Sequence, residues 1–222
     1  MLLTSWLTGL GQKLTGQFRR RRHRGTPRSY LRPPSWSECA ASQVLVLEAR
    51  MLLSAIWTGY GDDSNWSTAA NWSGATGPNG TPGFEDDVVI GAGFGTIFHS
   101  ADSDTVRSVT ADSPLSLSGG TLDVTLTFTD AAGLSLAGGT LANATVSSDT
   151  TIRIDGSGTL AGVTINGDVD ATQSANSYLY VTNGLTLNGT AYVGAADGST
   201  VGTIFCNGIE TLGGTGTIVF GG

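Results

Sequence analysis

The stretch Leu115-Ser-Leu-Ser-Gly-Gly-Thr-Leu122 decides the fold, because it recurs nineteen positions later as Leu134-Ser-Leu-Ala-Gly-Gly-Thr-Leu141. A looser copy with one inserted residue, Ile152-Arg-Ile-Asp-Gly-Ser-Gly-Thr-Leu160, begins eighteen residues further on, and Leu185-Thr-Leu-Asn-Gly-Thr continues the pattern. A period of about 20 residues is typical of solenoid proteins, whose units stack so that neighbours bury a continuous core.

Within each unit, apolar residues recur at every second position, as in Leu122, Val124, Leu126 and Phe128, so we expect strands with one inward face. Paired glycines between the strands supply tight corners. The near-constant period favours a parallel β-helix over a sandwich, whose hairpin loops vary in length. We therefore predict an all-β, single-stranded parallel β-helix of about six coils over residues 101–222, and crossover rules favour right-handed coils.

Residues 56–100 differ from the repeats in being rich in tryptophan. Trp57, Trp66 and Trp72 lie close together among Gly, Pro and Asn residues that favour turns. The first coil of a solenoid exposes an apolar cross-section that bulky aromatic side chains can cover, so we predict a Trp-rich N-terminal cap. The alternative is that these three tryptophans stack on sugar rings as a glycan-binding surface. With its Trp-x-Gly start and Asp-Asp-Val-x-Ile end, the region resembles segments that open β-helical stretches in bacterial surface proteins.

Charge is divided unevenly along the chain. Residues 1–50 hold nine of the eleven Lys and Arg residues and two acids, whereas residues 51–222 hold two basic residues and sixteen acids. The cationic run at 19–24 would be attracted to anionic lipid head groups or to nucleic acid. We predict that residues 1–55 form a basic export or sorting segment, partly helical or disordered, that meets a membrane surface or the export machinery. A basic tail without a partner and a nucleic-acid-binding tail are the alternatives; the acidic remainder offers no nucleic-acid surface.

The end of this segment carries a recognisable motif. The residues from Leu47 to Leu53, Leu-Glu-Ala-Arg-Met-Leu-Leu, resemble the Leu-Glu-Pro-Arg-x-Leu-Leu motif near the N-termini of large exported proteins of planctomycetes, with alanine at Ala49 in place of proline. The matching residues are Leu47, Glu48, Arg50, Leu52 and Leu53. The resemblance implies an extracytoplasmic, cell-surface or secreted location. The Leu-x-Leu-x-Gly-Gly repeats are similar in pattern to the β-strand repeats of autotransporter passenger proteins.

Two pairs of adjacent acids, Asp62-Asp63 and Asp86-Asp87, suggest calcium, because hard cations take several carboxylate and carbonyl oxygens as ligands. The spacing of an EF-hand is missing, and solvated loop acids are the simpler interpretation. We predict no resident metal or other cofactor, with calcium at these four acids or at Asp168 and Asp170 as the alternative.

A catalytic interpretation would use Asn166, Asp168 and Asp170, which at a spacing of two lie on one outward face of a strand, with Arg153 one coil away. A polysaccharide lyase or glycoside hydrolase needs such carboxylates and bases around the cleaved bond. Alternating polar residues are also what any half-buried strand shows on its wet face. The sequence holds no phosphate-binding loop, zinc spacing or Gly-x-Ser-x-Gly elbow, and we assign no catalytic residues.

These observations favour a non-enzymatic, exported β-helical module with a structural or adhesive role. Its expected partners are cell-envelope polysaccharide or another surface protein. The alternative is a carbohydrate-binding or polysaccharide-degrading β-helix that resembles pectate lyases.

Overall fold

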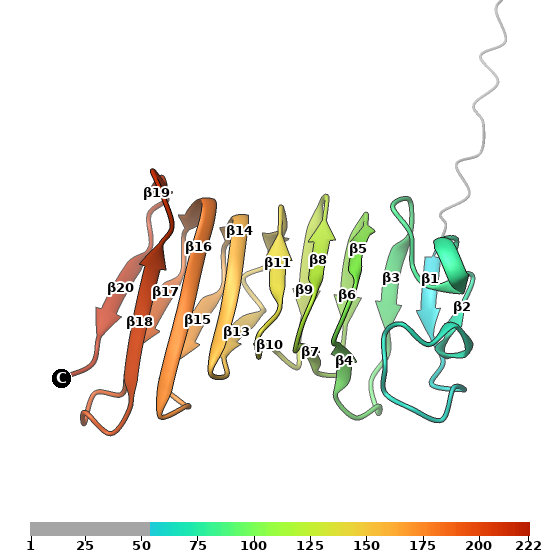
Figure 1. Cartoon of the computed structure of the whole chain (residues 1–222), viewed down its shortest axis with the longest axis horizontal. Helices are drawn as coiled ribbons and strands as arrows, with labels where there is room; N and C mark the ends of the chain where they lie inside the picture. The colour runs from blue at the N-terminus through green and yellow to red at the C-terminus, as the bar shows by residue number, and fades with distance from the viewer. Residues whose placement is uncertain (1–53) are drawn as a thin grey trace, which may run out of the picture. The chain divides into compact units, whose positions relative to one another are not determined.

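Residues 54–222 are described by a computed structural model, and they form a parallel β-solenoid of about six coils (Figure 1). Each complete coil contributes a strand to each of three faces. This confirms the all-β, stacked-coil architecture predicted from the repeats. The proposed sorting motif and the rest of the basic segment up to residue 53 lie outside the described residues.

Faces 1 and 2 are joined and face 3 is separate. Face 1 consists of β5 (Ser103–Val106), β8 (Thr121–Val124), β11 (Thr140–Ala142), the first parts of β14 (Ser157–Ile165) and β16 (Asn176–Leu187), and β18 (Val201–Cys206). Face 2 consists of β1 (Ser54–Trp57), β3 (Asp87–Ile90), β6 (Ser108–Ala111), β9 (Thr127–Asp130), β12 (Thr145–Val146), the second parts of β14 and β16, and β19 (Leu212–Gly213), with β2 (Trp72–Ser73) at its edge. Because β14 and β16 run through the corner, faces 1 and 2 make one thirteen-stranded sheet.

Face 3 is a seven-stranded sheet. It consists of β4 (Ile97–His99), β7 (Leu115–Leu117), β10 (Leu134–Leu136), β13 (Thr151–Ile154), β15 (Asp168–Ala171), β17 (Thr190–Val193) and β20 (Thr217–Phe220). The described residues contain two short 3-10 helices, Ala69–Asn71 and Pro78–Gly80, and no helix long and apolar enough to cross a membrane.

The sequence repeat places equivalent residues of successive coils directly above one another. On face 1, Thr121, Thr140 and Thr159 are register partners, one coil of nineteen residues apart each time. On face 3, Leu115 pairs with Leu134, and Leu134 pairs with Ile152. Their apolar side chains are fully buried, so the inward ladder of each face joins a single hydrophobic core.

The alternation expected through Leu126 is wrong at that residue. β8 ends at Val124 and β9 begins at Thr127, so Thr125 and Leu126 turn the corner between faces 1 and 2. Leu126 is 55 % exposed, and Phe128 points inward again. Side chains alternate between inward and outward only within a strand, and the alternation starts again after a corner.

The first coil is covered by the Trp-rich cap. β2 pairs antiparallel with β1, placing Trp57 opposite Trp72. The chain around Trp66 pairs with Phe98 at the edge of face 3, where the N–H of Trp66 donates to the carbonyl of Phe98 at 2.9 Å. β3 and β4 already pair in parallel with β6 and β7, so the faces begin before residue 100.

Candidate functional site

The most distinctive exposed feature is a group of three aromatic side chains on the outer side of face 1, which we call the aromatic platform: Tyr178, Tyr180 and Phe205. The rings of Tyr180 and Phe205 are stacked, with centroids 5.1 Å apart and planes 14° from parallel. The ring centroids of Tyr178 and Phe205 lie 6.1 Å apart, and their ring planes are tilted by 31°. Tyr178 is 38 % and Phe205 is 40 % exposed. Two of the three rings are therefore open to solvent, and the third, Tyr180, is half-buried.

Strand alternation and register together build the platform. In β16, Ser177 and Leu179 point inward and are buried, so the two tyrosines between and beyond them point outward. β18 pairs in parallel with β16, and its Phe205 is the register partner of Tyr180. That coil spans twenty-five residues, because the loop 194–200 lengthens it beyond the nineteen of the central coils.

The loop that sets this register is held in place by hydrogen bonds. The Thr200 hydroxyl donates to the carbonyl of Thr172 at 2.8 Å and accepts from the N–H of Ala195 at 2.9 Å. Gly194 and Gly198 have φ of 76° and 73°, which glycine adopts without steric cost. The loop is thus a defined structure that places Phe205 over Tyr180.

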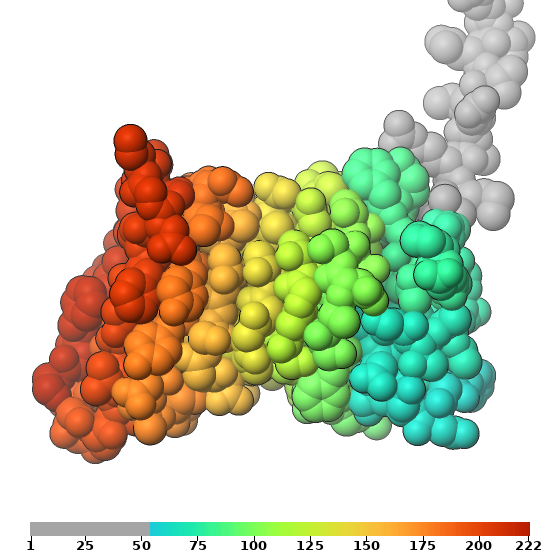
Figure 2. Space-filling model, in the orientation of Figure 1, coloured from blue at the N-terminus to red at the C-terminus, as the bar shows by residue number. Residues whose placement is uncertain are grey.

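A column of hydroxyl groups leads along face 1 to the platform. Successive register partners run from β5 to β18 in the order Ser103, Thr121, Thr140, Thr159, Tyr180 and Phe205. This face turns toward the viewer in Figure 2, with the platform strands in orange and red. An extended, hydroxyl-bearing polymer lying along the rod would meet donors and acceptors first and aromatic rings last.

The charge of the body limits which polymer fits. Residues 51–222 have two basic side chains, Arg107 and Arg153. Arg107 is bonded through its guanidinium to Asp87, and Arg153 lies in β13 on face 3. Aromatic platforms also stack nucleobases, but a phosphate backbone needs cations that face 1 does not supply among the described residues. The arrangement therefore favours a neutral ligand with an apolar ring face, such as a sugar.

The three tryptophans considered for glycan binding are packed inside the cap. Trp57, Trp66 and Trp72 are all buried. Their rings meet edge to face, with centroids 4.9 Å apart for Trp57 and Trp72 and 4.8 Å apart for Trp66 and Trp72. The Nε1–H of Trp72 donates to the carbonyl of Trp66 at 2.7 Å. This arrangement leaves no ring face open for a sugar.

Of the four paired acids considered for calcium, three accept hydrogen bonds from protein donors: Asp63, Asp86 and Asp87. Asp62 is exposed, and the Asp63 carboxylate accepts from the N–H of Asn65 at 3.0 Å, a bond that lowers the pKa of Asp63. Asp86 is fully buried and accepts three hydrogen bonds, from the N–H and hydroxyl of Thr76 and the N–H of Gly83, all at 2.8 Å.

Asp87 serves as an ion-pair partner. Its carboxylate accepts from the Nε–H of Arg107 at 2.8 Å and from the Ser108 hydroxyl at 2.6 Å, and the arginine holds the pKa of Asp87 below its usual range. Residues 54–222 contain no group of three or more His, Cys, Asp and Glu side chains arranged to hold a metal ion.

The candidate catalytic residues come together on face 3. Arg153 in β13 is the register partner of Asp170 in β15, as the repeat period predicts. No ion pair joins them among the described residues; Asp170 instead accepts from the N–H and hydroxyl of Thr172, at 2.9 and 2.6 Å. Asp168 accepts from the N–H of Thr190 at 2.8 Å. These bonds cap the turns between coils.

Asn166 belongs to a corner of the solenoid. Its side-chain oxygen accepts from the amide of Asn188, one coil later, at 2.8 Å. Asn188 in turn accepts from the N–H of Thr215 at 3.2 Å. Asn166 therefore starts a polar ladder that links three coils.

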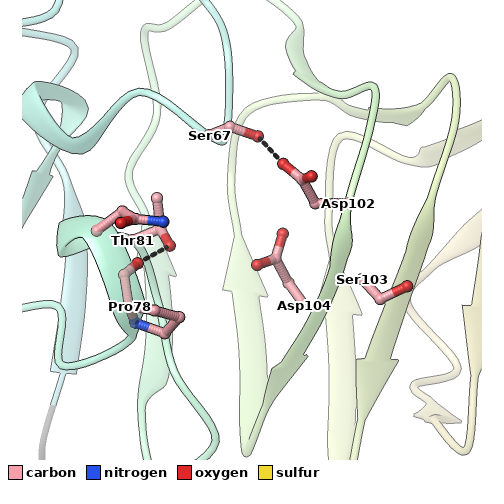
Figure 3. A pocket seen from close by; sticks show the side chains of 7 residues that line it. Ser67, Pro78, Thr81, Asp102, Ser103 and Asp104 are labelled. Atoms are coloured by element: carbon pink, nitrogen blue, oxygen red, sulfur yellow. Dashed lines mark hydrogen bonds between the residues drawn. The ribbon is translucent and has the colours of Figure 1, made fainter.

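A hollow of about 200 Å³ lies between the cap and β5 (Figure 3). It is lined in part by Ser67, Asp102 and Asp104. The Ser67 hydroxyl donates to Asp102 at 3.5 Å, and Asp104 lies 3.0 Å from Nε2 of the fully buried His99. Its carboxylates are therefore bonded within the chain, and we regard the aromatic platform as the better candidate site.

The sequence indicates part of the platform, but the repeat period does not show which residues lie side by side. Tyr178 and Tyr180 alternate with buried residues, which marks them as outward-facing, but Phe205 is twenty-five residues from its partner. Only the folded register joins them. The chain matches no protein-family model, no curated protein and no solved structure.

Proposed function

We propose that the solenoid is a non-enzymatic, glycan-binding adhesion module of an exported surface protein, and that the aromatic platform holds a neutral polysaccharide. The observation that carries the proposal is the pair of exposed rings Tyr178 and Phe205 on face 1, with the half-buried Tyr180 stacked on Phe205. A pyranose ring has an apolar C–H face that packs on an aromatic ring while its hydroxyls remain free to bond. The hydroxyl column of face 1 provides such partners along the same line.

The surroundings of the platform suit binding better than cleavage. The other outward positions of its strands carry Asn176, Thr182, Val201 and Thr203, and none is a carboxylate. Hydrolysis of a glycosidic bond uses a pair of carboxyl groups that flank the bond. A chain held on these rings would remain intact.

Export is the second part of the proposal. It is supported by the resemblance at Leu47–Leu53 and by the contrast between a basic N-terminal segment and an acidic, lysine-free remainder. The N-terminal sequence and cell fraction of the native protein, determined by mass spectrometry, test it. An intact chain confined to the cytoplasm would contradict export.

Binding is tested by screening the 222-residue chain on a glycan array and measuring the best neutral glycan by calorimetry. We expect Phe205→Ala and Tyr180→Ala each to weaken binding by about fivefold or more, since a stacking ring contributes about 1 kcal/mol or more. Tyr192→Ala is the matched control, because Tyr192 is an outward aromatic residue of β17 on face 3 and is 42 % exposed.

Two results would contradict the proposal. Equal weakening by Tyr192→Ala, or no binding to any glycan, would remove the platform from consideration. New reducing ends or unsaturated products from the bound glycan would show an enzyme and favour the polysaccharide-degrading alternative.

A further inference from the structure

Two inward positions beneath the cap carry ionisable side chains where the following coils carry leucine. His99 in β4 is the register partner of Leu117, and Asp104 in β5 is the register partner of Leu122. Leucine fills both positions in the next coil as well. Burying an ionisable pair costs desolvation that leucine would avoid. Core packing alone therefore does not account for His99 and Asp104.

The hydrogen bonds of the pair fix how many protons it holds. His99 is fully buried, with Nδ1 3.1 Å from the carbonyl oxygen of Gly119 and Nε2 3.0 Å from Oδ2 of Asp104. Because a carbonyl can only accept, Nδ1 carries a hydrogen. Nε2 and the carboxylate can then bond only through a second proton, carried by the nitrogen or by the oxygen. The folded pair therefore holds one proton more than a neutral histidine beside a carboxylate.

The charged groups around the pair favour this proton. Asp102 lines the same hollow as Asp104 (Figure 3), and the Asp63 carboxylate is bonded within the cap. The neighbouring stretch 115–122 carries no charged side chain. Arg107 is engaged with another carboxylate, and among the described residues no Lys or Arg pairs with Asp104. Negative charge without a compensating cation stabilises a bound proton.

His99 also lies where the cap meets the first coil. Its ring packs against the ring of Trp66, with centroids 5.8 Å apart and planes at 67°. The adjacent Phe98 makes two backbone hydrogen bonds with the cap: its N–H donates to the carbonyl of Ser64 at 2.8 Å, and its carbonyl accepts from the N–H of Trp66 at 2.9 Å. A displacement of the His99 ring would therefore act directly on the cap.

We propose that His99 and Asp104 form a proton-dependent latch that holds the cap on the first coil and releases it as the pH rises. With the shared proton in place, both ring nitrogens are hydrogen-bonded. The side chain of Asp104 is 15 % exposed at the hollow, which gives the proton a route to solvent water. Once it has left, the lone pair of Nε2 faces a carboxylate, and the two acceptors move apart. The ring of Trp66 then loses its support, and the cap loosens.

The first test is the pH dependence of chemical unfolding of the 222-residue chain. Histidine in an unfolded chain loses its proton at about pH 6.5, whereas the folded pair keeps its proton to a higher pH, so the stabilisation is lost as the pH rises. The reference is the double variant His99→Leu with Asp104→Leu, which carries the leucines of later coils and does not titrate at either position. Relative to it, we expect the unfolding constant of the native chain to be level from about pH 5 to about pH 6 and to rise about tenfold per pH unit above about 6.5, until the folded pair has lost its proton. Asp130 is present in both proteins, so its titration cancels.

The second test locates the change in the cap. Hydrogen exchange by mass spectrometry compares residues 64–72 with residues 134–154 of the central coils, so that the direct effect of pH on exchange cancels. Between about pH 6 and about pH 8.5 we expect the relative protection of the cap to fall about tenfold or more. Asp102→Asn is the matched control and should behave as the native chain, because Asp102 lines the hollow without bonding to His99 and asparagine tolerates its φ of 66°.

Three results would overturn the proposal. They are a ratio of unfolding constants that does not change with pH, a loss of protection spread evenly along the rod, and a loss that persists in the double leucine variant or disappears in Asp102→Asn. If the double variant does not fold, exchange in the native chain and in Asp102→Asn decides the matter, because cap protection independent of pH in these two proteins would by itself exclude the latch.

Discussion

Asp130 shows how one buried side chain fastens a corner of the solenoid. It ends β9, is fully buried, and accepts from the N–H of Leu115 at 3.2 Å and from the N–H groups of Ala132 and Gly133, both at 3.0 Å. The carboxyl group thus connects faces 2 and 3 across neighbouring coils. Burial raises the pKa of Asp130 to about 6, and the three backbone hydrogen bonds act in the opposite direction.

This raised pKa predicts a pH dependence of stability. The folded carboxyl has a pKa of about 6 against an ordinary 3.8, so folding favours the protonated form. The resulting stabilisation is complete below pH 3.8 and is lost as the pH rises through 6. Relative to Asp130→Asn, which does not titrate, the native chain should gain about 1 kcal/mol of unfolding free energy between pH 7 and pH 5. Urea unfolding of both proteins at each pH measures it, and a constant difference would contradict the prediction.

Single residues also show what a sequence leaves open. Tryptophan covers an apolar surface and stacks on sugars equally well, so the residue type at positions 57, 66 and 72 is compatible with a cap and with a glycan site. The structure buries all three, and Trp72 satisfies its indole N–H on the backbone of Trp66. Burial depends on how β2 folds back on β1, which no local pattern specifies.

At the scale of elements, glycines at the corner between faces 2 and 3 allow successive coils to approach closely. A Cβ on Gly167 would overlap the carbonyl oxygen of Thr150, one on Gly189 would overlap that of Gly167, and one on Gly216 would overlap that of Gly189. The obstacle in each case is backbone, which cannot rotate away. Glycine is required here by the spacing of the coils.

We predict that Gly189→Ala lowers the free energy of unfolding by about 2 kcal/mol or more, because the added methyl group forces the coils apart. Gly91→Ala is the matched control, since a Cβ there meets no atom within 4 Å and its φ lies outside the left-handed region. We expect it to change stability little or to increase it slightly. Chemical unfolding compares the two, and equal effects would show that coil spacing does not depend on this corner.

The strands themselves were largely predictable, and the platform was not. Repetition of Leu115–Leu122 at Leu134–Leu141 predicts the strands, the corner between them and their register, because each copy of the repeat stacks on the one before it. Phe205 and Tyr180 belong to a coil of different length, so their pairing depends on the fold of the loop 194–200. Insertions remove the periodicity on which register prediction relies.

At the scale of the whole molecule, stability should be graded along the rod. A central coil is paired on both sides, whereas β19 and β20 are paired on one. In a solenoid each coil depends mainly on its neighbours, so opening begins at an uncovered end. In the 222-residue chain we expect amide protons of β18–β20 to exchange fastest and those of β8–β13 slowest. Hydrogen exchange measured by mass spectrometry tests the gradient, and uniform protection would contradict it.

The constant register of Thr121, Thr140 and Thr159 also bears on how such a protein can change over evolutionary time. Duplication of the nineteen-residue window 121–139, which runs from one face 1 register position to the next, would supply one more complete coil with every inward and outward position preserved. Each such event would lengthen the rod by about 4.8 Å, the spacing of paired strands, without a new core having to be invented. Duplication or loss of whole coils in the gene can therefore change the length of the rod in equal steps, without altering the surfaces at either end.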